Sequence, residues 1–260
     1  MVLLHGFTND WRVWTPLLPL LEPHHSVFAP TSPGHFGGEP FPDGIAPSHR
    51  AMADAIERQM DARGIDKAHL AGNSQGGWLS LELAQRGRAL SVVGLCPAGG
   101  WERGSPEERA TIRFFARSEW ALRLSKPWFE TIARRPRMRA IAVRDVVAHP
   151  SRFSASSAHA FLETAAGCSI VDDLLALGRK GEAFGELGPI DCPVTIATAT
   201  RDRLFSRPGH FAKLRRLLPD ADWVVLEGLG HLPMVDDPEQ IAELILSVTG
   251  AGEPRALSAD

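Results

Sequence analysis

The stretch that decides the fold is Gly72-Asn73-Ser74-Gln75-Gly76-Gly77. It follows a short apolar run, 67–71, that predicts a buried strand, and it precedes a helical pattern. A G-x-S-x-G sequence between a strand and a helix predicts a sharp turn that presents Ser74 as a nucleophile. A side chain on Gly72 or Gly76 would collide with this turn. We therefore predict that Ser74 has strained backbone angles.

Short apolar runs bounded by Gly, Pro or Asp recur along the chain, which is typical of strands buried on both faces of a parallel sheet. Helical patterns lie between them, and the clearest helix start has Asp237 as N-cap and Pro238 at the first helical position. This alternation predicts an α/β fold, a mostly parallel sheet with helices on both faces. The expected strands are 2–4, 26–29, 67–71, 91–95, 194–199 and 223–226.

One long segment, 101–186, interrupts the alternation because it contains helical patterns and no convincing strand. We predict that it is a helical cap, inserted between an N-terminal part of the core, 1–100, and a C-terminal part, 187–260. Within it, residues 103–152 carry twelve Lys or Arg against five Asp or Glu. This charge predicts either a solvated outer face or an attraction for anionic substrates.

The composition excludes several other classes of protein. The 260 residues are 44% hydrophobic and 23% charged, which is ordinary for a folded domain. The net charge is −3, whereas a nucleic-acid binder usually has an excess of basic residues, so no nucleic-acid partner is expected. No apolar run is long enough to span a membrane, so no membrane partner is expected. No signal peptide is visible, and three widely spaced cysteines predict no disulfide framework and a cytoplasmic location. The histidines lack metal-site spacing, so no metal and no other cofactor is predicted.

A serine nucleophile needs a general base, and the base needs a carboxylate to orient it. His231 follows a predicted strand through a Gly-Leu-Gly turn, and Asp202 follows the preceding strand. Both loops are expected at the same edge of the sheet as Ser74, so we predict these three residues as a catalytic triad. The alternatives are that Asp202 only caps a helix and that His231 is an ordinary loop histidine.

The oxyanion formed during attack also needs hydrogen-bond donors, usually two backbone N–H groups. One is expected from Gln75, directly after the nucleophile. The other is expected from Phe7, in the loop after the first strand, where Gly6 allows a close turn.

These motifs resemble the α/β-hydrolase family, in its serine-nucleophile branch with a helical cap, over nearly the whole chain. The resemblance implies a cap after the sixth family strand and hydrolysis without a cofactor. The nucleophile motif is similar to that of carboxylesterases and carbon–carbon bond hydrolases. Dehalogenases and epoxide hydrolases of the family use aspartate where this chain has Ser74, which argues against those activities. The resemblance rests on His5-Gly6-Phe7, 72–77, Asp202 and Gly230-His231-Leu232-Pro233.

The chain departs from the family pattern at its start, because the first two family strands have no counterpart before His5. The run 26–29 is then expected to form a bare sheet edge. Either the true start lies upstream, or another segment or a second subunit of a homo-oligomer covers this edge.

The residues together predict a serine hydrolase that acts on a small molecule, a small or medium carboxylic ester, through an acyl-enzyme on Ser74. One alternative is cleavage of a carbon–carbon bond in a vinylogous diketone acid, whose carboxylate the basic cap would bind. An alternative from another class is a non-catalytic ligand-binding module. Six aromatic residues of the cap are expected either to line an apolar pocket or to form its core: Trp101, Phe114, Phe115, Trp120, Trp128 and Phe129.

Overall fold

The computed structural model describes residues 1–251; residues 252–260, the end of the predicted C-terminal core part, lie outside the described residues. Five strands form one sheet in the order β1-β2-β3-β4-β5, and every neighbouring pair is parallel, as predicted. The strands are β1 (Val2–Leu4), β2 (Ala68–Asn73), β3 (Ala89–Leu95), β4 (Val194–Ala199) and β5 (Asp222–Leu226).

The expected edge strand at 26–29 is a single bridge, in which Phe28 lies opposite Val2. Two hydrogen bonds of 2.9 Å hold it, from the Leu3 N–H to the Phe28 carbonyl and from the Phe28 N–H to the Met1 carbonyl. The prediction of a sixth strand was therefore right about its position and wrong about its extent. Pro30 follows at once and has no N–H group, so the ladder ends there.

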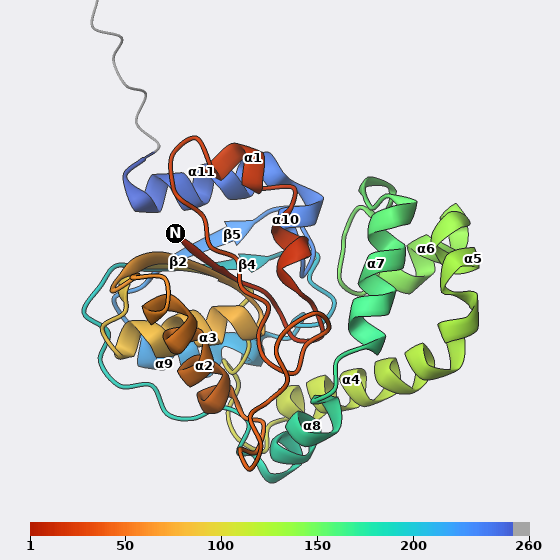
Figure 1. Ribbon diagram of the computed structural model, residues 1–260, viewed down its shortest axis with the longest axis horizontal. Coiled ribbons are helices and arrows are strands. Elements are labelled where there is room, and N and C mark those ends of the chain that lie inside the picture. The colour runs from red at the N-terminus through yellow and green to blue at the C-terminus, as the bar shows by residue number, and fades with distance from the viewer. Residues whose placement is uncertain (252–260) are drawn as a thin grey trace, which may run out of the picture.

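Helices cover both faces of the sheet (Figure 1). Each face buries its own apolar cluster, one around Trp78 and the other around Trp14. The first face carries α2 (His49–Asp61), α3 (Gln75–Gln85) and α9 (Ala212–Leu217), and the second carries α1 (Leu18–Leu21) and α11 (Pro238–Thr249). Shorter elements are α10 (Pro233–Asp236) and the 3₁₀ helices Trp11–Trp14, Lys126–Trp128, Pro150–Arg152 and Pro208–Phe211.

The helix starts follow local side-chain chemistry. Asp237 caps α11 as predicted, since its carboxylate accepts a hydrogen bond of 3.0 Å from the Gln240 N–H. None of the helices within residues 1–251 is long and apolar enough to cross a membrane.

The chain between β3 and β4 is helical, as predicted. Figure 1 shows its helices beside the layered core, with α5 and α6 farthest from the sheet. Ser105 caps the first of them by accepting a hydrogen bond from the Glu108 N–H. The helices are α4 (Pro106–Ser125), α5 (Phe129–Arg134), α6 (Pro136–Val143), α7 (Ala155–Ala166) and α8 (Val171–Lys180).

Candidate active site

The turn between β2 and α3 has the strained geometry that its sequence predicts. Ser74 has φ 54° and ψ −115°, a conformation that side chains rarely adopt. A Cβ atom on Gly72 would lie 2.1 Å from the Gly76 carbonyl oxygen, and one on Gly76 would lie 2.0 Å from the Leu4 carbonyl oxygen. The two glycines therefore let α3 rest directly on the sheet, with Ser74 at its tip.

The predicted site residues all follow the carboxyl ends of strands. Ser74 follows β2, Asp202 follows β4, and His231 follows β5, while the loop that contains Gly6 and Phe7 follows β1. In a parallel sheet these ends meet at one edge, which is where α/β folds form their ligand sites.

A short hydrogen bond joins His231 and Asp202. The His231 Nδ1–H donates to Asp202 Oδ2 over 2.7 Å, and both side chains are buried. The other carboxylate oxygen, Oδ1, accepts the backbone N–H groups of Leu204 and Phe205, each over 2.8 Å. Asp202 thus holds its own loop and not the start of a helix, as the alternative explanation had it, and it orients the imidazole at the same time.

The surroundings of Asp202 keep its carboxyl group ionised. Burial by itself raises the pKa, but the charge of His231, its hydrogen bond and the two loop N–H groups together lower the pKa below its ordinary value. An ionised carboxylate is an acceptor only, so it fixes the tautomer of His231 with the proton on Nδ1. Nε2 is then the nitrogen available as a base.

Ser74 and His231 line one cavity of about 300 Å³, together with Gly6 and Phe7. A second, smaller cavity of about 60 Å³ is lined by Ser74, Phe7 and Gln75. Ser74, His231, Phe7 and Gln75 therefore line these two cavities, and Asp202 joins them through its hydrogen bond to His231.

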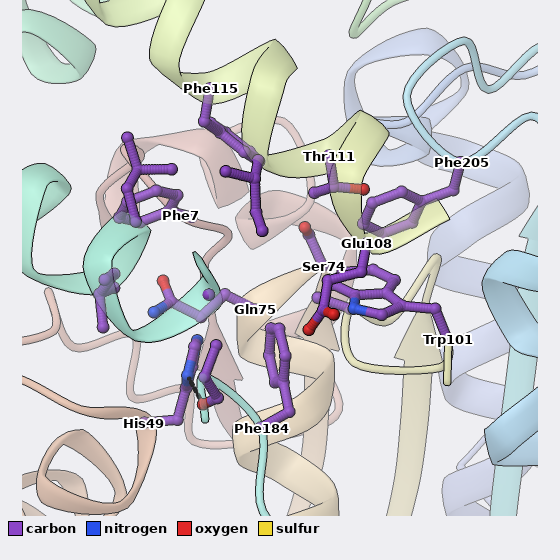
Figure 2. A pocket seen from close by; sticks show the side chains of 16 residues that line it. Phe7, His49, Ser74, Gln75, Trp101, Glu108, Thr111, Phe115, Phe184 and Phe205 are labelled. Atoms are coloured by element: carbon purple, nitrogen blue, oxygen red, sulfur yellow. Dashed lines mark hydrogen bonds between the residues drawn. The ribbon is translucent and has the colours of Figure 1, made fainter. Parts of the chain in front are cut away.

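The smaller cavity is almost entirely apolar. Figure 2 shows aromatic side chains from several elements around Ser74. Ser74, Phe7 and Phe115 line both cavities, so the serine lies where the two spaces meet. The aromatic residues of the smaller cavity are Phe7, Trp101, Phe115, Phe184 and Phe205.

The six aromatic residues expected in the pocket or in the core of the cap lie in three different environments. Trp101, Phe114 and Phe115 line the cavities, and Phe129 is buried among the helices. The side chains of Trp120 and Trp128 do neither, because these residues are 67% and 57% exposed.

The basic residues of the segment 101–186 lie outside both cavities. Within residues 1–251, no Lys or Arg lines either of them, whereas Glu108, Glu119 and Asp145 do. His49 lines the smaller cavity, but burial lowers its pKa to about 4, so it is neutral near pH 7. The cavities thus offer no fixed positive charge to an anionic substrate.

Three further residues contact the predicted site, and the sequence pattern gives them no role in it. The first is Cys96, which has φ 45° and follows β3. Its sulfur, a carboxylate oxygen of Asp202 and a ring nitrogen of His231 lie within 4.8 Å of one another, a grouping that could hold a metal ion. Burial, the charge of Asp202 and a hydrogen bond to it raise the pKa of Cys96, so the thiol stays protonated.

The other two, Asn73 and Asp236, hold the loop of His231. The Asn73 side-chain amide donates to the His231 carbonyl over 2.8 Å. Asp236 is fully buried, and its carboxylate accepts the N–H groups of Gly230, Ala148 and His149, each over 2.8 Å. It ties the loop of His231 to the helical segment, and two of its three partners, Ala148 and His149, are too distant in sequence for any spacing to indicate it.

A buried histidine fixes the loop that carries Phe7. The His5 Nδ1–H donates to the Gly6 carbonyl over 2.8 Å, and its Nε2 accepts the Ser32 N–H over 2.9 Å. Burial lowers the pKa of His5 to about 4, so the imidazole is neutral and serves as both donor and acceptor.

A parallel sheet with a strained serine turn and a His–Asp pair at its carboxyl edge defines the class of α/β hydrolases. The model of the alpha/beta hydrolase family matches residues 1–244, and the chain belongs to this family.

Known relatives differ in their reactions. The chain is 34% identical to epoxide hydrolase EphH of Mycobacterium tuberculosis over 202 residues, 77% of this chain and 94% of the relative. It is 27% identical to a pimeloyl-[acyl-carrier protein] methyl ester esterase of Xanthomonas campestris over 263 residues, 94% of this chain and 92% of the relative. A solved 2-hydroxy-6-oxo-6-phenylhexa-2,4-dienoate hydrolase from a Rhodococcus species has TM-score 0.73 and 21% identity, covering 96% of this chain and 90% of that one.

Proposed function

We propose that this α/β hydrolase is a serine esterase that cleaves a neutral carboxylic ester through an acyl-enzyme on Ser74. His231 takes the proton of the Ser74 hydroxyl as the oxygen attacks the carbonyl carbon, and later returns it to the departing alcohol. Asp202 holds the imidazole in its working tautomer. Water, activated by the same histidine, then hydrolyses the acyl-enzyme. The observation that carries this proposal is the His231–Asp202 hydrogen bond beside a serine in a strained turn.

The backbone N–H groups of Phe7 and Gln75 stabilise the oxyanion in this mechanism. Gln75 is the first residue of α3, so its N–H has no acceptor within the helix. In this proposal the helical segment 101–186 acts as a cap, because α4 supplies residues to both cavities.

The two cavities suggest how an ester would be oriented. His231 lines the larger cavity, and it must protonate the leaving group, so the alcohol part belongs there. The acyl part then enters the smaller cavity of about 60 Å³, which has room for roughly two water-sized groups. This arrangement favours a short acyl chain and a larger apolar alcohol.

The charged residues of the cavities help to decide between the two proposed substrates, an ester and a diketone acid. Binding a buried carboxylate without a cation would be costly, and the charged residues that line the cavities within residues 1–251 are the acidic Glu108, Glu119 and Asp145. The basic residues that were expected to bind such an acid lie elsewhere. A neutral substrate therefore fits better than an anionic one.

The relative named as an epoxide hydrolase keeps epoxides within the range of substrates to test, contrary to the expectation that the serine excludes them. We still favour an ester, because an ester carbonyl gives an oxyanion that the N–H groups of Phe7 and Gln75 can bind.

The test is a substrate panel run on the purified chain. We expect turnover of p-nitrophenyl esters with an optimum at acetate or propionate, falling steeply by octanoate. Ser74→Ala should abolish it, whereas Ser247→Ala, the same change on the exposed side of α11, should not. Styrene oxide and a vinylogous diketone acid complete the panel. Faster turnover of either than of the esters would contradict the proposal, as would an ester optimum at long acyl chains.

A further inference from the structure

The helical segment, 101–186, exposes an unusual set of side chains to solvent. Five large apolar side chains are exposed there, although such side chains are normally buried. The outward stripe of α4, at spacings of four, three and four residues, contains Arg113, Arg117, Trp120 and Leu124. The exposed apolar residues of this surface are Trp120 (67%), Leu124 (54%), Trp128 (57%), Met138 (36%) and Ile141 (65%).

This surface, which we call the Arg–Trp surface, is strongly basic. Residues 113–144 contain nine Lys or Arg and two Asp or Glu, whereas the rest of the chain contains nineteen Lys or Arg and twenty-nine Asp or Glu. The charge of the molecule is therefore separated, with +7 here and −10 elsewhere. Its exposed cations are Arg113, Arg117, Arg123, Lys126, Arg134, Arg135, Arg137 and Arg144.

The Arg–Trp surface meets the larger cavity at Ile141. Ala121 of α4 and Ile141 and Ala142 of α6 are exposed and also line that cavity. Ile141 thus belongs both to the Arg–Trp surface and to the exposed part of the cavity wall.

We propose that the Arg–Trp surface docks onto a lipid bilayer rich in anionic headgroups, with its apolar side chains in the interface and its cations against the lipid charges. Tryptophan is well suited to such an interface, and each arginine near an anionic membrane adds to the attraction. Charge complementarity selects this partner. Two copies of this chain would bring two surfaces of charge +7 together, and the acidic remainder of the molecule would turn toward the solution.

Docking onto the surface of a bilayer differs from crossing the bilayer. The sequence predicted no membrane partner, because no segment is long enough to cross a bilayer. A helix that lies on a membrane needs only an exposed apolar face, and only the structure identifies which side chains are exposed. The exposed part of the cavity wall at Ile141 would then face lipid, so an apolar alcohol moiety could enter there without crossing water.

The test is flotation of the full chain with vesicles of phosphatidylglycerol and phosphatidylcholine in equal parts, or of phosphatidylcholine alone, at low and high salt. We expect binding to the anionic vesicles only, weakened by salt. Two double variants, Trp120→Ser with Trp128→Ser and Arg113→Glu with Arg117→Glu, should each lower the affinity by at least about tenfold.

Matched controls carry the same chemistry elsewhere on the molecule. Trp11→Ser removes a tryptophan that is 42% exposed and lies outside the helical segment. Arg50→Glu with Arg58→Glu reverses the charge of two exposed arginines of α2. Both should leave vesicle binding unchanged. All variants should melt cooperatively within about 2 °C of the parent Tm, which shows that they are folded and keeps this test independent of the proposed esterase activity.

Three results would overturn the inference. One is the absence of binding to anionic vesicles, and another is equal binding by the surface variants and the parent. The third is a concentration-dependent dimer that the surface variants abolish while vesicles are not bound, because the surface would then join two copies.

Discussion

Replacing Asp236 by asparagine should both destabilise the protein and slow catalysis. The carboxylate is fully buried in the structure and accepts three backbone N–H groups. Oδ2 accepts those of Gly230 and Ala148, and Oδ1 accepts that of His149. An asparagine has one oxygen and one NH₂ group at these positions, so at least one N–H would face another donor.

The expected magnitude follows from this count. Losing one hydrogen bond to a buried charge costs about 1.5–3 kcal/mol, and the remaining two weaken when the acceptor becomes neutral. A loss of about 3 kcal/mol should lower the Tm of a protein of this size by roughly 6–12 °C. Because Gly230 precedes His231, the imidazole should also lose its position, and kcat should fall by about tenfold or more.

Thermal melts and ester kinetics on Asp236→Asn measure both effects. The neighbouring Asp237→Asn is the matched control, because asparagine caps a helix about as well as aspartate and α11 should keep its start. A Tm for Asp236→Asn within about 1 °C of the control would refute the role that we assign to this carboxylate.

Three further predictions concern the triad, the buried histidines and the tight turn. Asp202→Asn should lower kcat by about 10⁴-fold through the wrong imidazole tautomer, and a loss below about tenfold would mean that the acid is misassigned. His5, His35 and His49 have pKa values lowered by burial to about 4, 3 and 4, so the unfolded chain binds their protons first as the pH falls. Each should remove roughly 1.4 kcal/mol of stability per pH unit below about 6.5, and urea midpoints that stay constant from pH 7 to pH 5 would contradict this. Gly76→Ala should cost about 3 kcal/mol or more in a urea titration, because its Cβ would meet the Leu4 carbonyl at 2.0 Å, whereas Gly185→Ala meets no atom within 4 Å and should be tolerated.

Much of the fold follows from short-range pattern. Apolar runs between turn residues indicate all five strands, and the rule that parallel strands end at one edge predicts that Ser74, Asp202 and His231 lie close together. The edge at 26–29 is shorter than expected because pairing depends on backbone N–H groups, and Pro30 removes one.

The residues that the sequence could not assign are those whose role depends on distant partners. Asn73 holds the carbonyl of His231, 158 residues away, and Asp236 holds N–H groups of a segment almost ninety residues earlier. Helical periodicity also does not predict which aromatic side chains of a helix contact another helix or a strand and which face solvent. Phe115 and Trp120 lie on one helix, yet the first lines the catalytic cavities and the second faces solvent.

The central claim is that Ser74 is the nucleophile, and covalent labelling tests it most directly. The folded protein would be incubated with a fluorophosphonate, digested, and mapped by mass spectrometry beside Ser74→Ala. We predict one adduct, on Ser74, and none on the variant. An adduct on another residue, or no adduct on the folded parent chain, would contradict the account.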